Sequence, residues 1–236
     1  MHDLGDFSLR DMAECAARVR RLGQGASSME EAAGRIVTYL YDDLADHHSG
    51  QRACALVRFY KTHPYGLLDA GRRRGAEARA PGETTSPDAR YLALLATAGD
   101  EPAWRSVAGS QGHQAIPLDS AENAARVPMV HCLMNQLGID FSVSPPSSSS
   151  VTVAVDTRPS NSAASSSDVL SQDPFVSRHG IRSILGFGGQ LPAGDLFAVV
   201  LFTRVPIETG ARALFKTLAL AVKVSLMAFA HGPVFI

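Results

Sequence analysis

Apolar residues recur at helical intervals in two stretches near the N-terminus. The first stretch covers residues 9–22 and the second covers residues 29–44. Ser8 and Ser28 stand directly before them, where a serine side chain caps the free backbone amides of a first helical turn. Glu31 lies three positions after Ser28, which is the spacing of a capping box. The pattern therefore predicts two amphipathic helices.

A third helix is predicted in the last part of the chain. It starts at Pro206, since proline suits a first helical position, and it runs to about Phe229. Its residues are apolar on two sides, so the helix needs two partners. One partner is a sheet of the same chain. The other is the N-terminal helix or a second copy of the chain, and we therefore expect a homodimer.

Five short apolar runs have the length and the boundaries of β-strands. They cover residues 52–62, 91–97, 114–118, 180–187 and 196–203. Glycines and a proline separate the last two runs, which predicts an antiparallel hairpin with a longer loop. Together with the helices, these runs predict an α+β fold: a central antiparallel sheet with flanking helices and a long C-terminal helix.

Two stretches show neither pattern. Residues 69–89 are rich in Arg, Gly, Pro and Thr, and the basic run 72–74 within them is interpreted as part of a solvated loop. Residues 142–172 hold serine-rich tracts on both sides of residues 151–155, which suit a strand. Because such tracts are flexible, we expect a flexible Ser-rich insertion in a single domain of residues 1–236. A linker between two domains is the alternative.

Composition narrows the class of protein. The 236 residues are 45% hydrophobic and carry a net charge of -1, so the chain lacks the basic excess of proteins that bind nucleic acid through phosphates. No membrane span is expected, because Arg212, Lys216 and Lys223 interrupt the most apolar region. The sequence shows no signal-peptide pattern, and its three cysteines are too widely spaced for a disulfide framework. We therefore expect a cytoplasmic location.

Three segments, residues 53–66, 94–104 and 180–189, resemble a sensory domain found ahead of bacterial histidine kinases. The order of predicted elements also resembles the GAF and PAS sensory folds, in which a central sheet carries helices on one face and a ligand pocket on the other. The resemblance implies a domain that senses a small molecule or a cofactor. Six residues follow Ala230, with no kinase domain, so we expect the output to pass through a signalling protein partner.

Two arginines lie among the apolar residues of predicted strands, Arg58 and Arg182. A buried guanidinium needs a partner of opposite charge. Each arginine is therefore a candidate for binding the carboxylate or phosphate of a ligand. An internal salt bridge or an edge position is the alternative for both.

Four other residues complete the candidate ligand site. Tyr60 and Trp104 suit the wall of an apolar pocket, although both residue types also serve in protein cores. His113 and His179 flank predicted strands, and haem needs only one axial histidine. Haem is thus a possible cofactor, with a structural or surface histidine as the alternative for each. The histidine spacings match no zinc helix.

These observations predict a ligand-binding signalling domain and assign no catalytic residue. Two alternatives stay open. One is a ligand-free dimerisation or interaction module, whose pocket is filled by its own side chains. The other is a small enzyme on the same fold that uses the thiol of Cys54 or Cys132.

Overall fold

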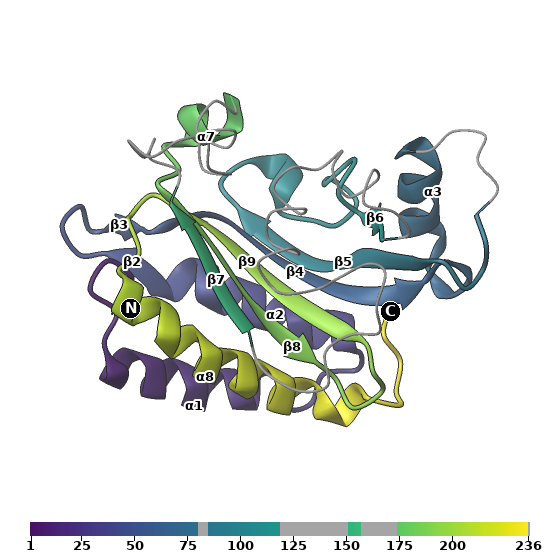
Figure 1. Ribbon diagram of the computed structural model, residues 1–236, viewed down its shortest axis with the longest axis horizontal. Coiled ribbons are helices and arrows are strands. Elements are labelled where there is room, and N and C mark those ends of the chain that lie inside the picture. The colour runs from purple at the N-terminus through teal and green to yellow at the C-terminus, as the bar shows by residue number, and fades with distance from the viewer. Residues whose placement is uncertain (80–84, 119–150, 157–173, 236) are drawn as a thin grey trace.

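A six-stranded antiparallel sheet forms the middle of the molecule (Figure 1). The structure is a computed structural model and describes residues 1–79, 85–118, 151–156 and 174–235. The described part of the chain confirms the predicted α+β fold, including a strand within the Ser-rich region. In spatial order the strands are β6 (Ala115–Pro117), β5 (Arg90–Gly99), β4 (Cys54–Pro64), β9 (Leu196–Thr203), β8 (Ser183–Gln190) and β7 (Val151–Asp156).

The hairpin of β8 and β9 has a shorter loop than the sequence predicts. Strand β8 begins three residues later than expected and continues through Gly188 as far as Gln190. A Cβ atom at Gly188 would lie 2.1 Å from the carbonyl oxygen of Phe197, so only glycine allows the two strands to approach this closely. The glycines that indicate a loop in the sequence therefore belong to the strand, and the loop is confined to residues 191–195.

Three helices lie on one side of the sheet: the second and third contact its strands, and the first packs mainly against the third (Figure 1). They are α1 (Leu9–Leu22), α2 (Met29–Asp43) and α8 (Thr209–Leu226). Ser8 caps α1 in a reciprocal capping box with Asp11, and Ser28 caps α2. The expected box at α2 is only half formed, because the Glu31 carboxylate accepts hydrogen bonds from Ser27 instead of Ser28.

Helix α8 begins at Thr209 and not at Pro206. The buried Ser183 side chain accepts a hydrogen bond of 3.2 Å from the backbone N–H of Ile207, and this contact holds residue 207 outside the helix. The helix ends at Leu226, and a 3-10 turn, η3 (Met227–Phe229), follows it.

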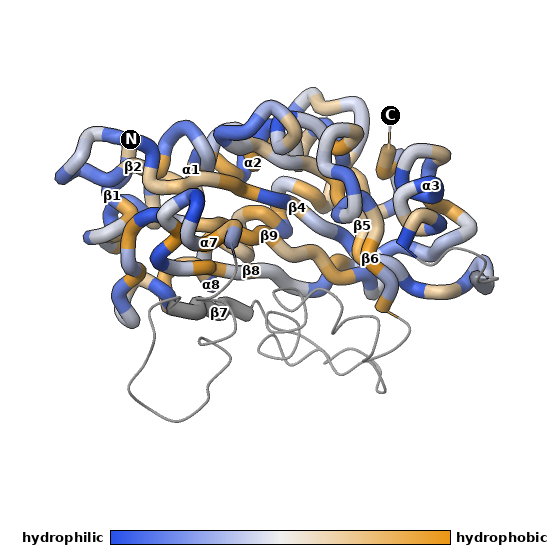
Figure 2. Tube along the Cα trace, turned by 90° about the horizontal axis from the view of Figure 1, so that it is seen from above, coloured by the Kyte–Doolittle hydropathy of each residue, from blue (hydrophilic) through white to orange (hydrophobic). Residues whose placement is uncertain are grey.

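The main hydrophobic core lies between this helix layer and the sheet. Its largest side chains include Phe187 and Phe215, whose ring centroids are 5.5 Å apart, and neither is exposed. Much of β9 is orange in Figure 2, in agreement with its buried apolar residues. This core holds most of the clustered, buried apolar side chains of the described residues, so packing on the helix side is the main source of stability.

The other face of the sheet carries shorter elements: α3 (Ala70–Arg79), η2 (Pro102–Trp104) and α7 (Pro174–His179). Helix α3 contradicts the solvated loop expected over residues 69–89. Arg72, from the basic run, is only 4% exposed. Its guanidinium donates hydrogen bonds to the Leu94 carbonyl oxygen at 2.8 Å and to the carboxylates of Asp69 and Glu30, so these contacts compensate for its burial.

A small three-stranded sheet lies beside the helices. Its strands are β1 (His2–Asp3), β2 (Leu44–Asp46) and β3 (Gln51–Arg52), with β2 in the middle. Strand β2 begins at Leu44, which the sequence pattern places at the end of the second helix. A polar turn, residues 47–50, follows it.

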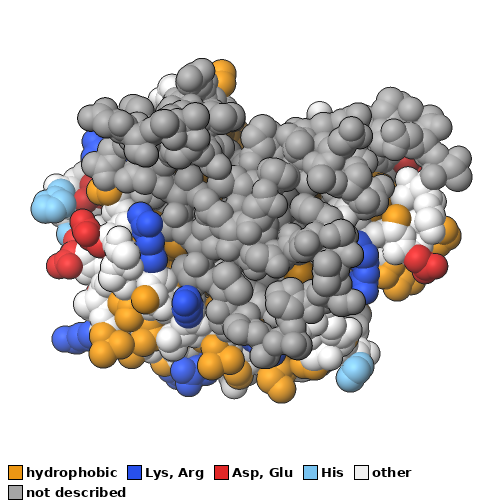
Figure 3. All heavy atoms as spheres, viewed as in Figure 1, with side chains coloured by type: hydrophobic (Ala, Val, Ile, Leu, Met, Phe, Trp, Pro, Cys, Tyr) orange, Lys and Arg blue, Asp and Glu red, His pale blue; other side chains and the backbone are white. Residues whose placement is uncertain are grey.

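One side of α8 faces solvent. Leu220 and Val224 of α8, and Met227 at the start of η3, are 53%, 44% and 52% exposed. Figure 3 shows hydrophobic side chains next to Lys and Arg side chains along this part of the molecule. Within the described residues, every helix is too short or too polar to cross a lipid bilayer.

Candidate functional site

Arg58 lies in the middle of the sheet, on the face without the long helices. It pairs in register with Thr97 of β5 and Val200 of β9. Its neighbours Val57 and Phe59 belong to the core on the helix side. Because side chains alternate along a strand, Arg58 points to the opposite face. Its side chain is buried there, with 6% of the residue exposed.

The guanidinium of Arg58 has no partner among the described residues. It donates no hydrogen bond and forms no ion pair with any of them, and its Nε is buried without an acceptor. A charged group in this situation costs several kcal/mol relative to water unless a ligand or another group compensates its charge. This feature sets Arg58 apart from Lys61 and Arg72, the other buried Lys and Arg side chains in the described ranges.

His113 lies close to Arg58, in the loop that leads into β6. Burial, together with the positive charges of Arg58 and Arg79, lowers the pKa of His113 to about 4. Its Nδ1 is 3.2 Å from the carbonyl oxygen of Gln111. The imidazole is therefore neutral at physiological pH and gains a proton more readily if an anion enters beside it.

Arg79 ends helix α3 next to the same loop. Its Nε and Nη2 both donate to the carbonyl oxygen of Gly112, and its charge interacts with Tyr60, which is 3% exposed. No carboxylate pairs with Arg79 or Arg58 within the part of the chain that the structure describes. Arg58, Tyr60, Arg79 and His113 thus form a group, here called the arginine cluster, that is rich in positive charge and in hydrogen-bond donors.

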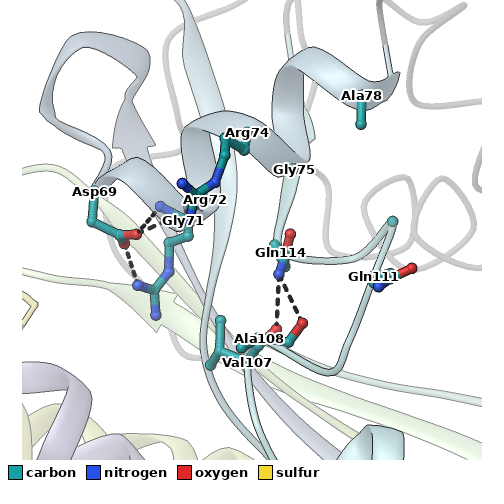
Figure 4. A pocket seen from close by; sticks show the side chains of 11 residues that line it. Asp69, Gly71, Arg72, Arg74, Gly75, Ala78, Val107, Ala108, Gln111 and Gln114 are labelled. Carbon is teal, nitrogen blue, oxygen red and sulfur yellow. Dashed lines mark hydrogen bonds and ion pairs between the residues drawn. The ribbon is translucent and has the colours of Figure 1, made fainter.

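A cavity of about 480 Å³ lies beside the arginine cluster, between α3 and residues 107–114 (Figure 4). Gly75 allows the helix to approach this loop, because a Cβ atom there would lie 2.4 Å from Oε1 of Gln114. The Gln114 amide donates to the carbonyl oxygens of Val107 and Ala108, both at 3.2 Å. The cavity and the cluster share the loop but not their side chains, since Arg58, Tyr60 and His113 do not line the cavity.

Trp104 and His179 lie in a different group from Arg58. Their ring centroids are 4.6 Å apart, and both pack against Phe175, whose ring also contacts Phe202. This aromatic group covers the sheet near α7. Both residues are partly buried. Besides this packing, the Trp104 carbonyl oxygen accepts a hydrogen bond of 2.9 Å from the Thr97 hydroxyl, and His179 interacts electrostatically with Asp100.

The predicted burial of Arg182 is wrong. The residue is exposed and stands just before β8, where its backbone N–H donates to the carbonyl oxygen of Thr203 at 2.7 Å. The strand starts one residue later than Arg182, so its side chain is not part of the sheet face. Of the six candidates from the sequence, the structure brings Arg58, Tyr60 and His113 together.

Arg79 is the residue that the sequence analysis missed. A signal was present, because Arg72, Ala76 and Arg79 are spaced at i, i+4 and i+7 and so share one side of a helix. Residues 69–89 are rich in Arg and Gly, a composition typical of a polar loop, so the helical spacing was not recognised. Burial of an arginine in a helix this polar depends on tertiary contacts that lie far away in the sequence.

The thiol of Cys54, the described candidate for an enzyme, is not reactive in this state. Cys54 is fully buried, and burial raises its pKa to about 12. A thiol that stays protonated is a poor nucleophile. Cys132, the other candidate, and the neighbouring His131 lie outside the described residues.

Comparison with known proteins gives similarities of fold at low sequence identity. No family model matches the chain, and no curated protein does. The chain is similar to the GAF domain of an Acinetobacter phosphoenolpyruvate-protein phosphotransferase, with 13% identity, a TM-score of 0.42 and coverage of 93% of this chain and 94% of that one. It is also similar to the phycocyanobilin-bound GAF domain of a cyanobacterial phytochrome, with 11% identity, a TM-score of 0.46 and coverage of 92% and 94%.

The antiparallel sheet and its helices are confirmed by the structure itself. The bilin belongs to the phytochrome domain named above, and the functional proposals below depend on the residues of this chain.

Proposed function

We propose that this chain is a sensory domain that binds a small molecule bearing a carboxylate or a phosphate on the face of the sheet opposite α1, α2 and α8. The observation that carries the proposal is the guanidinium of Arg58, which is buried and has no partner among the described residues. Arg79 and His113 add positive charge or donors beside it. Tyr60 and the buried apolar residues that cluster with it, such as Leu94 and Ile116, supply a surface for the uncharged part of the ligand.

Binding would compensate the charge of Arg58. A charge-assisted hydrogen bond contributes about 1.5–3 kcal/mol, and more where water is excluded. The ligand therefore stabilises the folded state by an amount that rises with the logarithm of the ratio of its concentration to its Kd. A ligand that binds one packing of the elements on the sheet more tightly than another shifts the population toward that packing, which is how a sensory domain responds to its signal.

A homodimer is the second part of the proposal. The exposed residues Leu220, Val224 and Met227 are spaced at i, i+4 and i+7, which is the spacing of a seam between two helices. Two copies related by a twofold axis would bury this seam against itself. Sedimentation velocity tests it: the wild type is expected to run as a dimer and a Leu220→Glu variant as a monomer. A monomeric wild type would remove this part of the proposal.

Native mass spectrometry of the purified protein is the first test of ligand binding. We expect a fixed mass increment per chain, and the absorption spectrum of the same sample shows whether that increment is haem. Thermal shift and calorimetry with phosphate, benzoate and decanoate then measure the affinity for defined anions. Arg58→Met should weaken binding at least about tenfold, since it removes the charged hydrogen bonds.

Arg182→Met is the matched control, because Arg182 is exposed and lies outside the arginine cluster. Its affinities should equal those of the wild type. Equal binding by Arg58→Met and the wild type would contradict the proposal. A pure protein without any increment that also ignores all three anions would favour the ligand-free interaction module.

A further inference from the structure

His2 is held between two carboxylates on the helix side of the molecule. Its Nδ1 lies 2.8 Å from Oδ1 of Asp11, and its Nε2 lies 3.1 Å from Oδ2 of Asp43. The residue is only 8% exposed. Three elements meet here, because His2 comes from β1, Asp11 from α1 and Asp43 from the end of α2.

Cys15 completes this group. It lies one helical turn after Asp11 on α1 and is fully buried, and its Sγ accepts a hydrogen bond of 3.5 Å from the Tyr39 hydroxyl. One ligand atom from each of His2, Cys15 and Asp43 lies within 4.8 Å of the other two. Imidazole nitrogen, thiolate sulfur and carboxylate oxygen are all common zinc ligands.

We propose that His2, Cys15 and Asp43 bind a Zn²⁺ ion. Ligand bonds of about 2.0–2.3 Å around tetrahedral zinc place the ligand atoms roughly 3–4 Å apart, so only a small contraction of the present group is needed. A neutral imidazole, a thiolate and a carboxylate together carry two negative charges, which balance the charge of the ion. One tetrahedral position remains for water or another ligand.

Asp11 acts as the positioning residue for this site. Its contact with Nδ1 of His2 leaves Nε2, the nitrogen that faces Asp43, as the metal ligand. Carboxylates that orient a ligating histidine in this way are typical of zinc sites, and their loss costs about 10–100-fold in metal affinity. The ion would fasten the short strand β1 to α1 and α2.

The test uses Co²⁺ alone as a spectroscopic substitute for zinc, added to the full-length chain after treatment with a chelator and without a metal-binding tag. We expect one Co²⁺ per chain, with the near-ultraviolet charge-transfer band of a cobalt–thiolate bond and the visible bands of tetrahedral cobalt. One equivalent of Zn²⁺ should abolish the spectrum. A folded wild type that binds no stoichiometric metal would overturn the proposal.

Variants assign the ligands. Cys15→Ala should lose the charge-transfer band, and His2→Gln should lower the affinity at least about tenfold. Asp11→Asn should keep the band and lower the affinity by about 10–100-fold, a pattern that a merely structural role would not give. Cys54→Ala and Cys132→Ala are the matched thiol controls, and both should keep the spectrum.

Circular dichroism shows that each variant is folded before its titration. His2 is near the end of the chain and outside the main core, so His2→Gln keeps the proposal testable if Cys15→Ala does not fold. Unchanged binding in folded His2→Gln, or loss of the band in Cys132→Ala, would place the metal elsewhere and overturn the assignment.

Discussion

Two buried cations on one strand differ in the acceptors that surround them. Lys61 and Arg58 both lie on β4, and they are 3% and 6% exposed. The Lys61 ammonium is 2.6 Å from Oδ2 of Asp195 and 3.0 Å from the carbonyl oxygen of Thr62, and it also lies 3.3 Å from Nδ1 of His63. Arg58 has no such partner among the described residues.

The difference separates structural charges from functional ones. A cation that stabilises the fold is surrounded by its own acceptors, as Lys61 is and as Arg72 is on α3. A cation without acceptors lowers stability, and such groups gather where a protein binds or reacts. We therefore expect that replacing a cation that has acceptors destabilises the fold, whereas replacing Arg58 does not.

The largest effect is expected at Asp195, which joins two cations. Its other oxygen is 2.6 Å from Nη1 of Arg90. Asp195→Asn would leave Lys61 buried without a counter-charge, and we expect a loss of about 3–5 kcal/mol in the free energy of unfolding. Urea denaturation measures it. Asp88→Asn, at an exposed position in the loop before β5, should change the value by about 0.5 kcal/mol or less.

Arg72→Met should have the next largest effect. The variant leaves the Leu94 carbonyl oxygen without its donor and removes the cation from the ring of Phe235, 4.3 Å away. Its two carboxylate partners are partly exposed and regain water, so we expect about 2–3 kcal/mol. Arg74→Met, on the exposed side of α3, is the control. Equal unfolding curves for the two variants would mean that the contacts of Arg72 do not stabilise the fold.

The pH dependence of stability tests the environment of His63, which lies beside Lys61. Burial and the charge of Lys61 lower the pKa of His63 to about 4, from an ordinary value of 6.5. The unfolded chain thus binds a proton at higher pH than the folded one, and the free energy of unfolding falls as the pH drops from 6.5 to 4. We expect His63 to account for about 2 kcal/mol of this fall.

Urea denaturation at several pH values measures the slope. His63→Gln should flatten it, whereas His48→Gln, at an exposed position, should not. A slope that stays the same in His63→Gln would show that the folded state protonates this histidine as easily as the unfolded chain does.

The smallest effect on stability, and the most telling, is expected for Arg58→Met. Methionine fills a similar volume without the charge, so the free energy of unfolding should stay within about 1 kcal/mol of the wild-type value or rise. The measurement is made on ligand-free protein. A loss of several kcal/mol would mean that the guanidinium already has a partner, and the contrast with Lys61 would disappear.

Local patterns in the sequence predict most of the fold but only part of the site. Ser8 and Ser28 identify the starts of two helices because capping depends on neighbouring residues alone. Strand β9 matches the predicted range, since its apolar run has clear boundaries. In contrast, Gly188 and Arg72 are misinterpreted. The close approach of β9 to Gly188 and the acceptors of Arg72 on distant elements cannot be read from a local pattern.

The same limit applies to the site. The sequence identifies Arg58 as buried, but its lack of a partner depends on which carboxylates the fold brings near it. Arg182 has a similar sequence environment and lies outside the sheet face. Tertiary structure alone distinguishes these two arginines.

The central pairing of β4 with β9 has a consequence for synthesis of the protein. Lys61 and Asp195, which join the two strands at one end, are 134 positions apart in the chain. At about 5–20 residues per second, a ribosome takes roughly 7–27 s to make the segment between them. During this time β4 can pair with β5, but its other edge, apolar and open, has no strand to pair with. Chains interrupted before β9 would therefore be expected to associate through this edge and to depend on chaperones.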